Sequence, residues 1–191
     1  AAAIDPVLDY DHASGQAHTG SADAVLAAAQ AQGLRLRWIL ETHAHADHLS
    51  AAPYLRERTG APIAVGEHIR EVQRIFRPVF AADDVKPEGG DFDLLLRDGE
   101  RLKLGSLEIE VIHTPGHTPA CVCYRIGDDV FVGDTLFMPD GGSARADFPG
   151  GDARTLYQSI KRVLSMPDAT RLFMCHDYGP NGRDIAWETT V

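Results

Sequence analysis

Hydrophobic and polar residues follow a helical spacing in some stretches of the chain and alternate in others, which predicts a mixture of helices and strands. The stretch over residues 21–33 starts with a serine suited to capping a helix and ends in a glycine, and Asp152 stands where it would cap the last helix. The predicted helices cover residues 21–33, 47–60, 67–76 and 152–165.

Strand patterns dominate the middle of the chain. Residues 101–116 alternate around a Gly-Ser turn, and residues 120–134 form a predicted hairpin around a glycine and two aspartates. Further strands are predicted over residues 35–40, 62–66 and 171–175, and the polar segment 83–93 is expected to be a connection or a flexible lid. This order of elements predicts a mixed α/β fold with two layers of sheet.

The length of the chain bears on its domain organisation. A chain of 191 residues is long enough for one domain with a substantial core and short for two, so we expect a single domain over residues 1–191. The chain opens with "AAAIDP", which has the character of the end of a strand, and stops at "AWETTV" without a turn or cap. We therefore expect the sequence to be a segment of a slightly longer protein.

Composition and charge exclude two classes of partner. The formal net charge is −10 and no cluster of Lys and Arg interleaved with aromatic residues occurs, so nucleic acid is not an expected partner. No run of about eighteen apolar residues occurs, so no membrane partner is expected.

The three cysteines are an odd number in a chain of this size, which indicates a reducing, cytoplasmic environment. Cys121 and Cys123 are expected to be buried structural residues.

Potential metal ligands stand where predicted strands end. Four of them lie within the short segment "HAHADH" after the strand over residues 35–40, and one follows each of three later strands. These residues are His43, His45, Asp47, His48, His117, Asp134 and His176. Because ligands collect at the carboxyl ends of strands in open α/β sheets, these separate segments are expected to converge on one pocket.

The types of these side chains indicate a borderline divalent metal. Imidazole nitrogen and carboxylate oxygen suit Zn(II), Fe(II) and Mn(II), and no cysteine stands near the cluster in the sequence. An extended H-x-H segment directs two rings to one side, whereas Asp47 and His48 would begin the next helix. The resulting sets are His43, His45 and His117 for one metal, and Asp47, His48 and His176 for a second, with Asp134 between them. The ligands suffice for two metals, and the sequence leaves open whether both are bound.

Four segments resemble the metal-binding segments of the metallo-β-lactamase superfamily. They are "THAHADH" (42–48), "PGHT" (115–118), "GDT" (133–135) and "CHDY" (175–178). The resemblance extends over essentially the whole chain. It implies an αββα sandwich, in which two sheets face each other with helices outside and a metal site along one edge, and it implies that part of the family's N-terminal strands is lacking here.

The segment over residues 133–184 is similar to the persulfide dioxygenases, also called sulfur dioxygenases, and particularly to their bacterial branch of β-lactamase-like hydrolases. This resemblance implies oxidation of glutathione persulfide by O2 to sulfite and glutathione. It implies one Fe(II) per chain held by His43, His117 and Asp134, a set that leaves three coordination positions open. The other residues, which are His45, Asp47, His48 and His176, would orient this site or bind a second metal.

The same resemblance implies two substrate contacts. Arg145 would meet a carboxylate of glutathione, for which a guanidinium fork is suited, and Tyr178 would line the substrate pocket. Arg145 has an equally weighted structural alternative, a pairing with Asp147 or Asp152. The segment "MPDGGSA" (138–144) is longer than in the animal enzymes, which affects the glutathione contacts more than the iron ligands.

Two other functions use the same residues. A hydrolase of glyoxalase II type would bind two metals, such as Zn(II), and attack a glutathione thioester with metal-bound hydroxide. A non-catalytic module that senses metal or sulfide is the alternative from a different class. A homodimer is possible, and a mitochondrial location is expected in place of the cytoplasm if the source is a eukaryote.

Overall fold

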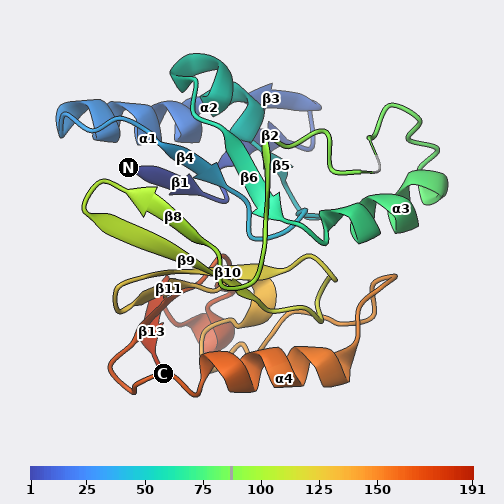
Figure 1. Cartoon of the computed structure of the whole chain (residues 1–191), viewed down its shortest axis with the longest axis vertical. Coiled ribbons are helices and arrows are strands. Elements are labelled where there is room, and N and C mark those ends of the chain that lie inside the picture. Colours follow the sequence, from blue (N-terminus) through green and yellow to red (C-terminus); the bar gives the residue numbers. More distant parts are fainter. Residues whose placement is uncertain (87) are drawn as a thin grey trace.

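Two β-sheets lie face to face in the computed structural model, which describes residues 1–86 and 88–191 (Figure 1). The first sheet is parallel and has the strand order β1-β4-β6-β7. Its strands are β1 (Ala2–Ile4), β4 (Trp38–Leu40), β6 (Ile63–Gly66) and β7 (Leu94–Leu96). All four residues of β6, which has the sequence IAVG, are buried. A continuous run of small and apolar residues is expected for a parallel strand that is covered on both faces.

The second sheet is mostly antiparallel and has the order β13-β12-β11-β10-β9-β8. Its strands are β8 (Arg101–Leu104), β9 (Leu107–His113), β10 (Val122–Ile126), β11 (Asp129–Phe131), β12 (Arg171–Phe173) and β13 (Glu188–Thr190). Two short turns join β8 to β9 and β10 to β11, and each begins with a glycine of positive φ, Gly105 (φ 66°) or Gly127 (φ 64°). These glycines allow the left-handed turns that match the twist of the paired strands.

The core between the sheets follows from the alternation of side chains along each strand. Trp38 and Leu40 of β4 face inward, as do Val122 and Tyr124 of β10, and these residues pack in one buried cluster. The intervening Cys123 faces the opposite side of its strand and packs in the outer layer. Both sheets therefore have two buried faces.

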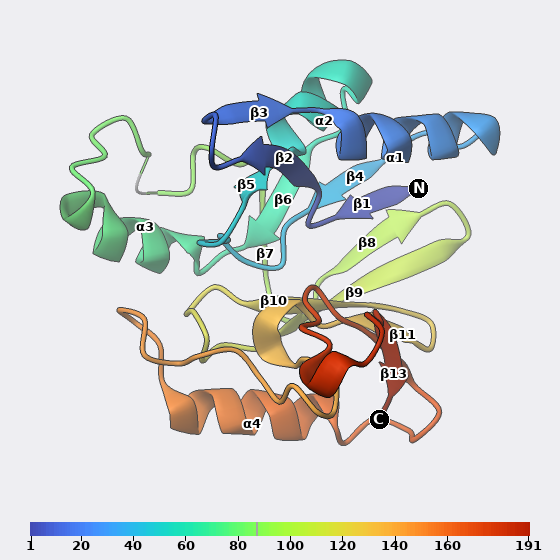
Figure 2. The same cartoon turned by 180° about the vertical axis from the view of Figure 1, so that it is seen from behind.

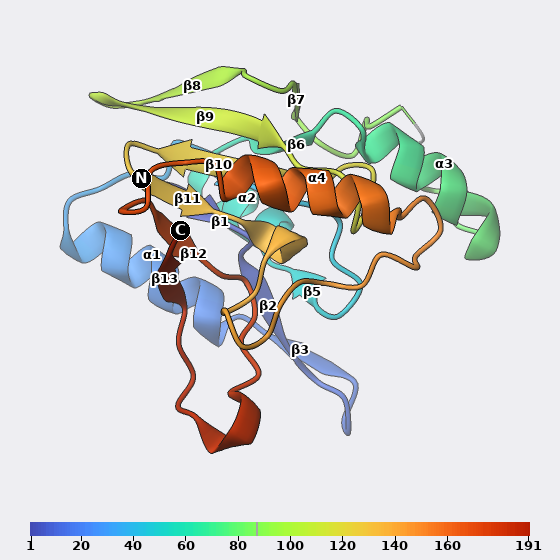
Figure 3. The same ribbon diagram turned by 90° about the horizontal axis from the view of Figure 1, so that it is seen from below.

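Helices cover the outer faces of the sandwich (Figure 2). Helices α1 (Gly20–Ala31) and α2 (Ala52–Thr59) pack against the first sheet through Ala22 and Leu55. Helix α4 (Ala153–Val163) crosses the second sheet on the other side of the molecule, as the view from below shows (Figure 3). Helix α3 (Ile69–Val79) packs with Val65 and Ala120 near the edge of the sandwich.

The remaining elements are short. Strands β2 (Val7–Asp11), β3 (Gln16–His18) and β5 (Leu49–Ser50) form a small antiparallel sheet. Two 3-10 turns, η1 (Gly133–Thr135) and η2 (Pro180–Gly182), follow β11 and β12.

The structure confirms the predicted αββα fold, both central hairpins and the Asp152 cap. The Asp152 carboxylate accepts a 2.7 Å hydrogen bond from the backbone N–H of Thr155. Cys121 and Cys123 are buried as predicted. Within the described residues no helix is long and apolar enough to cross a bilayer.

The helix predicted over residues 47–60 is wrong at its start. Asp47 and His48 lie in an irregular loop, Leu49 and Ser50 form β5, and α2 begins only at Ala52. Backbone pairing of Leu49 with Leu8 of β2 overrides the local helical preference. The sequence patterns also missed the short strands β2, β3, β5, β7 and β13.

Candidate metal centre

The predicted ligands meet at one edge of the sandwich, where strands of both sheets end. The segment after β4 comes from the first sheet, and the segments after β9, β11 and β12 come from the second. Asp134 lies in the turn η1, directly after β11. The convergence predicted from the sequence is therefore present, and the side chains divide into two groups.

The inner group consists of His43, His117 and Asp134, which are 2%, 6% and 7% exposed. The Nε2 atoms of His43 and His117 each lie 3.7 Å from Oδ2 of Asp134. This separation is too long for a hydrogen bond, and it suits three donor atoms around a metal with bonds of about 2.0–2.2 Å.

In each histidine of the inner group, the Nδ1 atom is held by a neighbouring group, which leaves Nε2 to face the metal site. His117 Nδ1 lies 2.7 Å from the Arg145 carbonyl oxygen, which can only accept, so Nδ1 carries the proton and Nε2 has the free lone pair. His43 Nδ1 lies 3.0 Å from the Thr42 hydroxyl, which in turn donates to Asp5 at 2.8 Å. Because the hydroxyl hydrogen is used on Asp5, Thr42 accepts from Nδ1 of His43, and Nε2 is again the free donor atom.

Burial and neighbouring charges set the protonation of the inner group. Burial, reinforced by the nearby charge of His45, holds the pKa of His43 well below its ordinary value, so its ring is neutral, as a ligand must be. Burial also raises the pKa of Asp134, although the surrounding histidines oppose this shift. A buried carboxylate needs a compensating positive charge, which a metal between it and the two imidazoles would supply.

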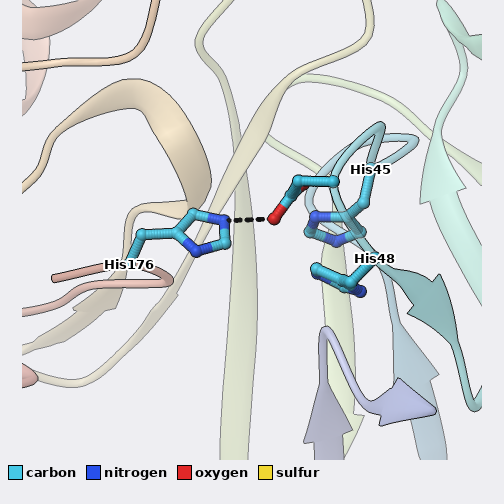
Figure 4. Close-up of side chains that lie close together, drawn as sticks. His45, His48 and His176 are labelled. Atoms are coloured by element: carbon cyan, nitrogen blue, oxygen red, sulfur yellow. Dashed lines mark ion pairs between the residues drawn. The ribbon is translucent and has the colours of Figure 1, made fainter. Parts of the chain in front are cut away.

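The outer group consists of His45, Asp47, His48 and His176. Figure 4 shows the rings of His45 and His48 on one side and His176 on the other, with an ion pair from His176 to the carboxylate between them. His176 Nε2 lies 3.3 Å from Asp47 Oδ2 and 3.4 Å from Asp134 Oδ1. Asp134 thus faces the inner group with one oxygen and the outer group with the other, which is the intermediate position expected from the sequence.

His45 is held differently from the other ligands. Its Nε2 lies 3.0 Å from Asp5 and 3.5 Å from Glu41, two side chains that sequence reasoning missed. Burial alone would lower the pKa of His45, but Asp5 and Glu41 raise it to about 10. The structure places His45 with the outer group, not in one set with His43 and His117 as its H-x-H spacing suggested.

Asp5 connects both groups. Its carboxylate accepts from the backbone N–H and hydroxyl of Thr42, from the Cys175 thiol at 3.1 Å and from His45. Its backbone φ of 46° is in the left-handed region, which is uncommon for an aspartate and brings the side chain back toward the ligands. The only signal in the sequence was an aspartate at the end of a strand.

Four buried side-chain atoms in the described part of the chain have no hydrogen-bond partner, and all of them belong to this region. They are Glu41 Oε2, His45 Nδ1, Asp134 Oδ1 and His176 Nε2. Buried polar atoms are normally paired, so three ligand atoms without partners in one cluster fit a site that binds metal. The inner group offers two imidazoles and one carboxylate, and the outer group offers a second set around Asp134 Oδ1.

The two predicted substrate contacts lie at the rim of the site. Arg145 makes a bidentate ion pair with Asp147, at 2.5 and 2.8 Å, which is the structural alternative foreseen for it. Its guanidinium also covers the ring of Phe148, which packs edge-on against His117. Tyr178 is 70% exposed, and its ring stacks beside that of His176 at 6.3 Å. Burial and the charges of Asp134 and Asp47 raise the pKa of Tyr178, so it stays neutral beside the cluster.

Comparison with known proteins identifies the family. The model of the metallo-β-lactamase superfamily matches residues 4–176, and the chain belongs to this superfamily. The crystal structure of ETHE1 from Myxococcus xanthus has a TM-score of 0.73 and 32% identity, and covers 99% of this chain and 68% of that one. The recognition of the superfamily from four short segments is thus confirmed, and this neighbour supports the persulfide dioxygenase branch.

More similar sequences have less specific names. A protein of Burkholderia pseudomallei named "Probable metallo-hydrolase" is 56% identical over 201 residues, and the match covers 100% of this chain and 68% of that protein. A "Beta-lactamase hydrolase-like protein" of Xylella fastidiosa is 55% identical over 190 residues, covering 100% of this chain and 44% of that protein. The chain thus spans 44% to 68% of the length of these relatives.

Two remoter relatives have names that state different reactions. Human mitochondrial persulfide dioxygenase ETHE1 is 32% identical over 92% of this chain and 58% of that protein. A hydroxyacylglutathione hydrolase of Rhizobium meliloti is 33% identical over 90% of this chain and 61% of that protein. The superfamily is enzymatic, and these two relatives, which are similarly distant from this chain, are named as an oxidoreductase and a hydrolase.

Proposed function

We propose that this chain is a persulfide dioxygenase that oxidises glutathione persulfide with O2 to sulfite and glutathione. The observation that carries the proposal is the inner group, a two-histidine, one-carboxylate set whose donor atoms are turned toward one point. Such a set is typical of non-haem Fe(II) oxygenases. One Fe(II) per chain, held by His43, His117 and Asp134, would supply open coordination positions for a persulfide sulfur and for O2.

The rest of the chain orients and encloses this site. Thr42 and the Arg145 carbonyl fix the tautomers of the two inner histidines, so that their Nε2 atoms remain available. The outer residues His45, Asp47, His48 and His176 would hold water and steer the reacting groups. The third oxygen of sulfite comes from water, which His176 and Asp47 are placed to orient beside Asp134.

Arg145 and Tyr178 are the proposed contacts for the thiol carrier. The side chains of the Arg145–Asp147 ion pair are 62% and 68% exposed, so the pair contributes little to stability and a carboxylate of glutathione can replace Asp147. Tyr178 is exposed beside His176 and stays neutral, which suits contact with the peptide part of the carrier.

A second candidate is a two-metal thioester hydrolase of glyoxalase II type. The observation that favours it is the outer group, which offers a second set of ligands. In this set, Nε2 of His176 lies 3.3 Å from Oδ2 of Asp47 and 3.4 Å from Oδ1 of Asp134. In this case Asp134 would help to hold a metal in each group, since its Oδ2 faces the inner group and its Oδ1 faces His176. The remote similarity to a hydroxyacylglutathione hydrolase agrees with this alternative.

One pair of measurements separates the candidates. Protein purified without oxygen is analysed for metals, and is then tested both for O2 uptake with glutathione persulfide and for hydrolysis of S-lactoylglutathione. About one iron per chain with O2 uptake supports the dioxygenase. Two zinc ions per chain with thioester hydrolysis and no O2 uptake would overturn the proposal in favour of the hydrolase.

A further inference from the structure

One arginine joins the two loops that border the outer side of the metal centre. Arg183 donates from Nε and one terminal nitrogen to both oxygens of Asp140, at 2.8 and 2.9 Å. It also donates from both terminal nitrogens to the two oxygens of Asp177, at 2.8 and 2.7 Å. We call this arrangement, Asp140–Arg183–Asp177, the Arg183 clamp. It is a double bidentate pairing that uses the planar fork of a guanidinium, which lysine cannot reproduce.

The segment that carries Arg183 turns back, so that its residues lie beside Asp177. The backbone N–H of Ala186 donates to Asp177 at 2.7 Å, and the Asp177 side chain is only 3% exposed. Gly179 has a φ of 50°, and a Cβ there would lie 2.5 Å from the carbonyl oxygen of Arg183. The turn therefore depends on a glycine, and the pairing with Arg183 holds the pKa of Asp177 well below its ordinary value.

The other end of the clamp lies in the long segment after Asp134. The backbone N–H of Phe137 donates to the carbonyl of Gly142, and that of Gly142 donates to Met138, which closes residues 137–142 into a turn. Asp140 stands at the tip of this turn. The clamp thus fixes the tip of this turn, within the segment 138–144, to the loop that carries Asp177.

Two aromatic rings lie next to the residues that the clamp joins. Phe137 opens the 137–142 turn, and Tyr178 follows Asp177 directly. The Phe137 ring packs edge-on against Tyr178 at 5.6 Å and edge-on against His176 at 6.0 Å. Phe137 and Tyr178 therefore form an aromatic wall beside His176 of the outer group.

We propose that Arg183 is a positioning residue that, by joining Asp140 to Asp177, holds this aromatic wall in place to contact the uncharged peptide part of a glutathione-type thiol carrier. The rings offer apolar faces and one neutral hydroxyl, which suit methylene and amide groups and not carboxylates. The placement of the wall does not depend on which reaction occurs. The choice of carrier rests on the proposed function, but glutathione is a product of both candidate reactions.

The first test measures the clamp itself by hydrogen–deuterium exchange of the metal-loaded protein. Asp140→Asn removes the charge from one end, and Arg183→Lys keeps the charge but loses the fork. In both variants, amide exchange is expected to rise at least about tenfold in residues 137–142 and 178–186 together, because strong charged hydrogen bonds are lost. The matched control is Asp129→Asn, which breaks a bidentate pair with Arg171 of 2.7 and 2.8 Å at the start of β11.

The second test measures carrier binding with glutathione as the probe. For Asp140→Asn and Arg183→Lys, the Kd of glutathione for the metal-loaded protein is expected to rise about tenfold relative to Asp129→Asn, with unchanged metal content. In turnover, KM should rise by the same factor while kcat stays within about twofold, a division that a general loss of stability would not give.

Three results would overturn the proposal. Exchange that rises only at the substituted loop would show that the clamp does not couple the two segments. A rise in both segments without a change in glutathione affinity would show a structural role alone. Wild-type binding or turnover by Arg183→Lys would show that the fork is not needed. If the wild-type protein binds no glutathione, the proposed carrier fails, whereas exchange still decides whether the clamp positions the wall.

Discussion

The inner and outer groups contain the same types of ligand but are held in different ways. The residues of the inner group are almost fully buried. Nδ1 of each of its histidines is held by an uncharged group, the Thr42 hydroxyl for His43 and the Arg145 carbonyl for His117. In the outer group the Asp47 side chain is 52% exposed, and Nδ1 of His48 lies 3.2 Å from the carbonyl oxygen of the adjacent Leu49. The inner group is therefore preorganised for a metal before one binds, whereas Asp47 and His48 of the outer group are not.

Charge separates the two groups as well. His43 is neutral because it is buried, whereas His45 is bound to two buried carboxylates that favour its protonated form. A metal at Nδ1 of His45 would have to displace a proton, because metal ligands must be deprotonated. This difference predicts that the inner group binds its metal first and more tightly, which agrees with the proposed single iron.

The largest expected effect comes from Asp134, which faces both groups. Asp134→Asn should abolish iron binding and lower O2 uptake with glutathione persulfide by more than about 100-fold, since loss of a direct ligand exceeds the 10- to 100-fold typical of an orienting partner. Metal analysis and an oxygen electrode give the two readings. Retention of one iron per chain in this variant would show that the inner group does not need its carboxylate.

A smaller effect is expected from the group that orients His43. Thr42→Val keeps the shape of the side chain but removes the hydroxyl between His43 and Asp5. Iron affinity should fall about 10- to 100-fold, because the Nδ1 proton of His43 loses its acceptor. Competition with a chelator measures the affinity. Thr59→Val, which loses a hydroxyl bond to Leu55 away from the site, is the control and should bind iron like the wild type.

Removing a ligand of the outer group should have a still smaller effect. His48→Ala is expected to retain one iron per chain and to lose less than about tenfold in O2 uptake, because His48 would only orient water. If the protein is instead a two-metal hydrolase, the same change should remove one of two metals and most thioester hydrolysis. Metal content and the two activity assays on the same preparation therefore decide between the roles of the outer group.

Local patterns predicted much of the fold. The central hairpins follow from strand alternation around glycine turns, and α4 follows from a cap made within one turn of the chain, by Asp152 and Thr155. Strand β5 was not predictable in this way. It consists of two residues that are extended only because β2 pairs with them, and the pairing partner is distant in the sequence.

The site shows the same division between local and distant information. The types and strand-end positions of the ligands were readable, because "HAHADH" concentrates them in one segment. Their division into groups was not, since it depends on Asp5, which contacts His45 across forty residues of sequence. A long-range hydrogen bond leaves no periodic pattern in a single sequence.

The smallest expected effect tests whether solvent reaches the buried cysteines next to the inner group. Burial raises the pKa of Cys121 to about 12 and that of Cys123 to about 11, and Cys121 contacts Thr118, the neighbour of His117. At pH 8 only about one thiol in a thousand or fewer would be ionised, and both are out of reach of solvent. Iodoacetamide should therefore leave Cys121 and Cys123 of the native protein unmodified, and should label both after denaturation, as read by peptide mass spectrometry. Rapid labelling of Cys121 in the native protein would show that water reaches the back of the inner group, and the contrast between a buried inner group and an accessible outer group would then be lost.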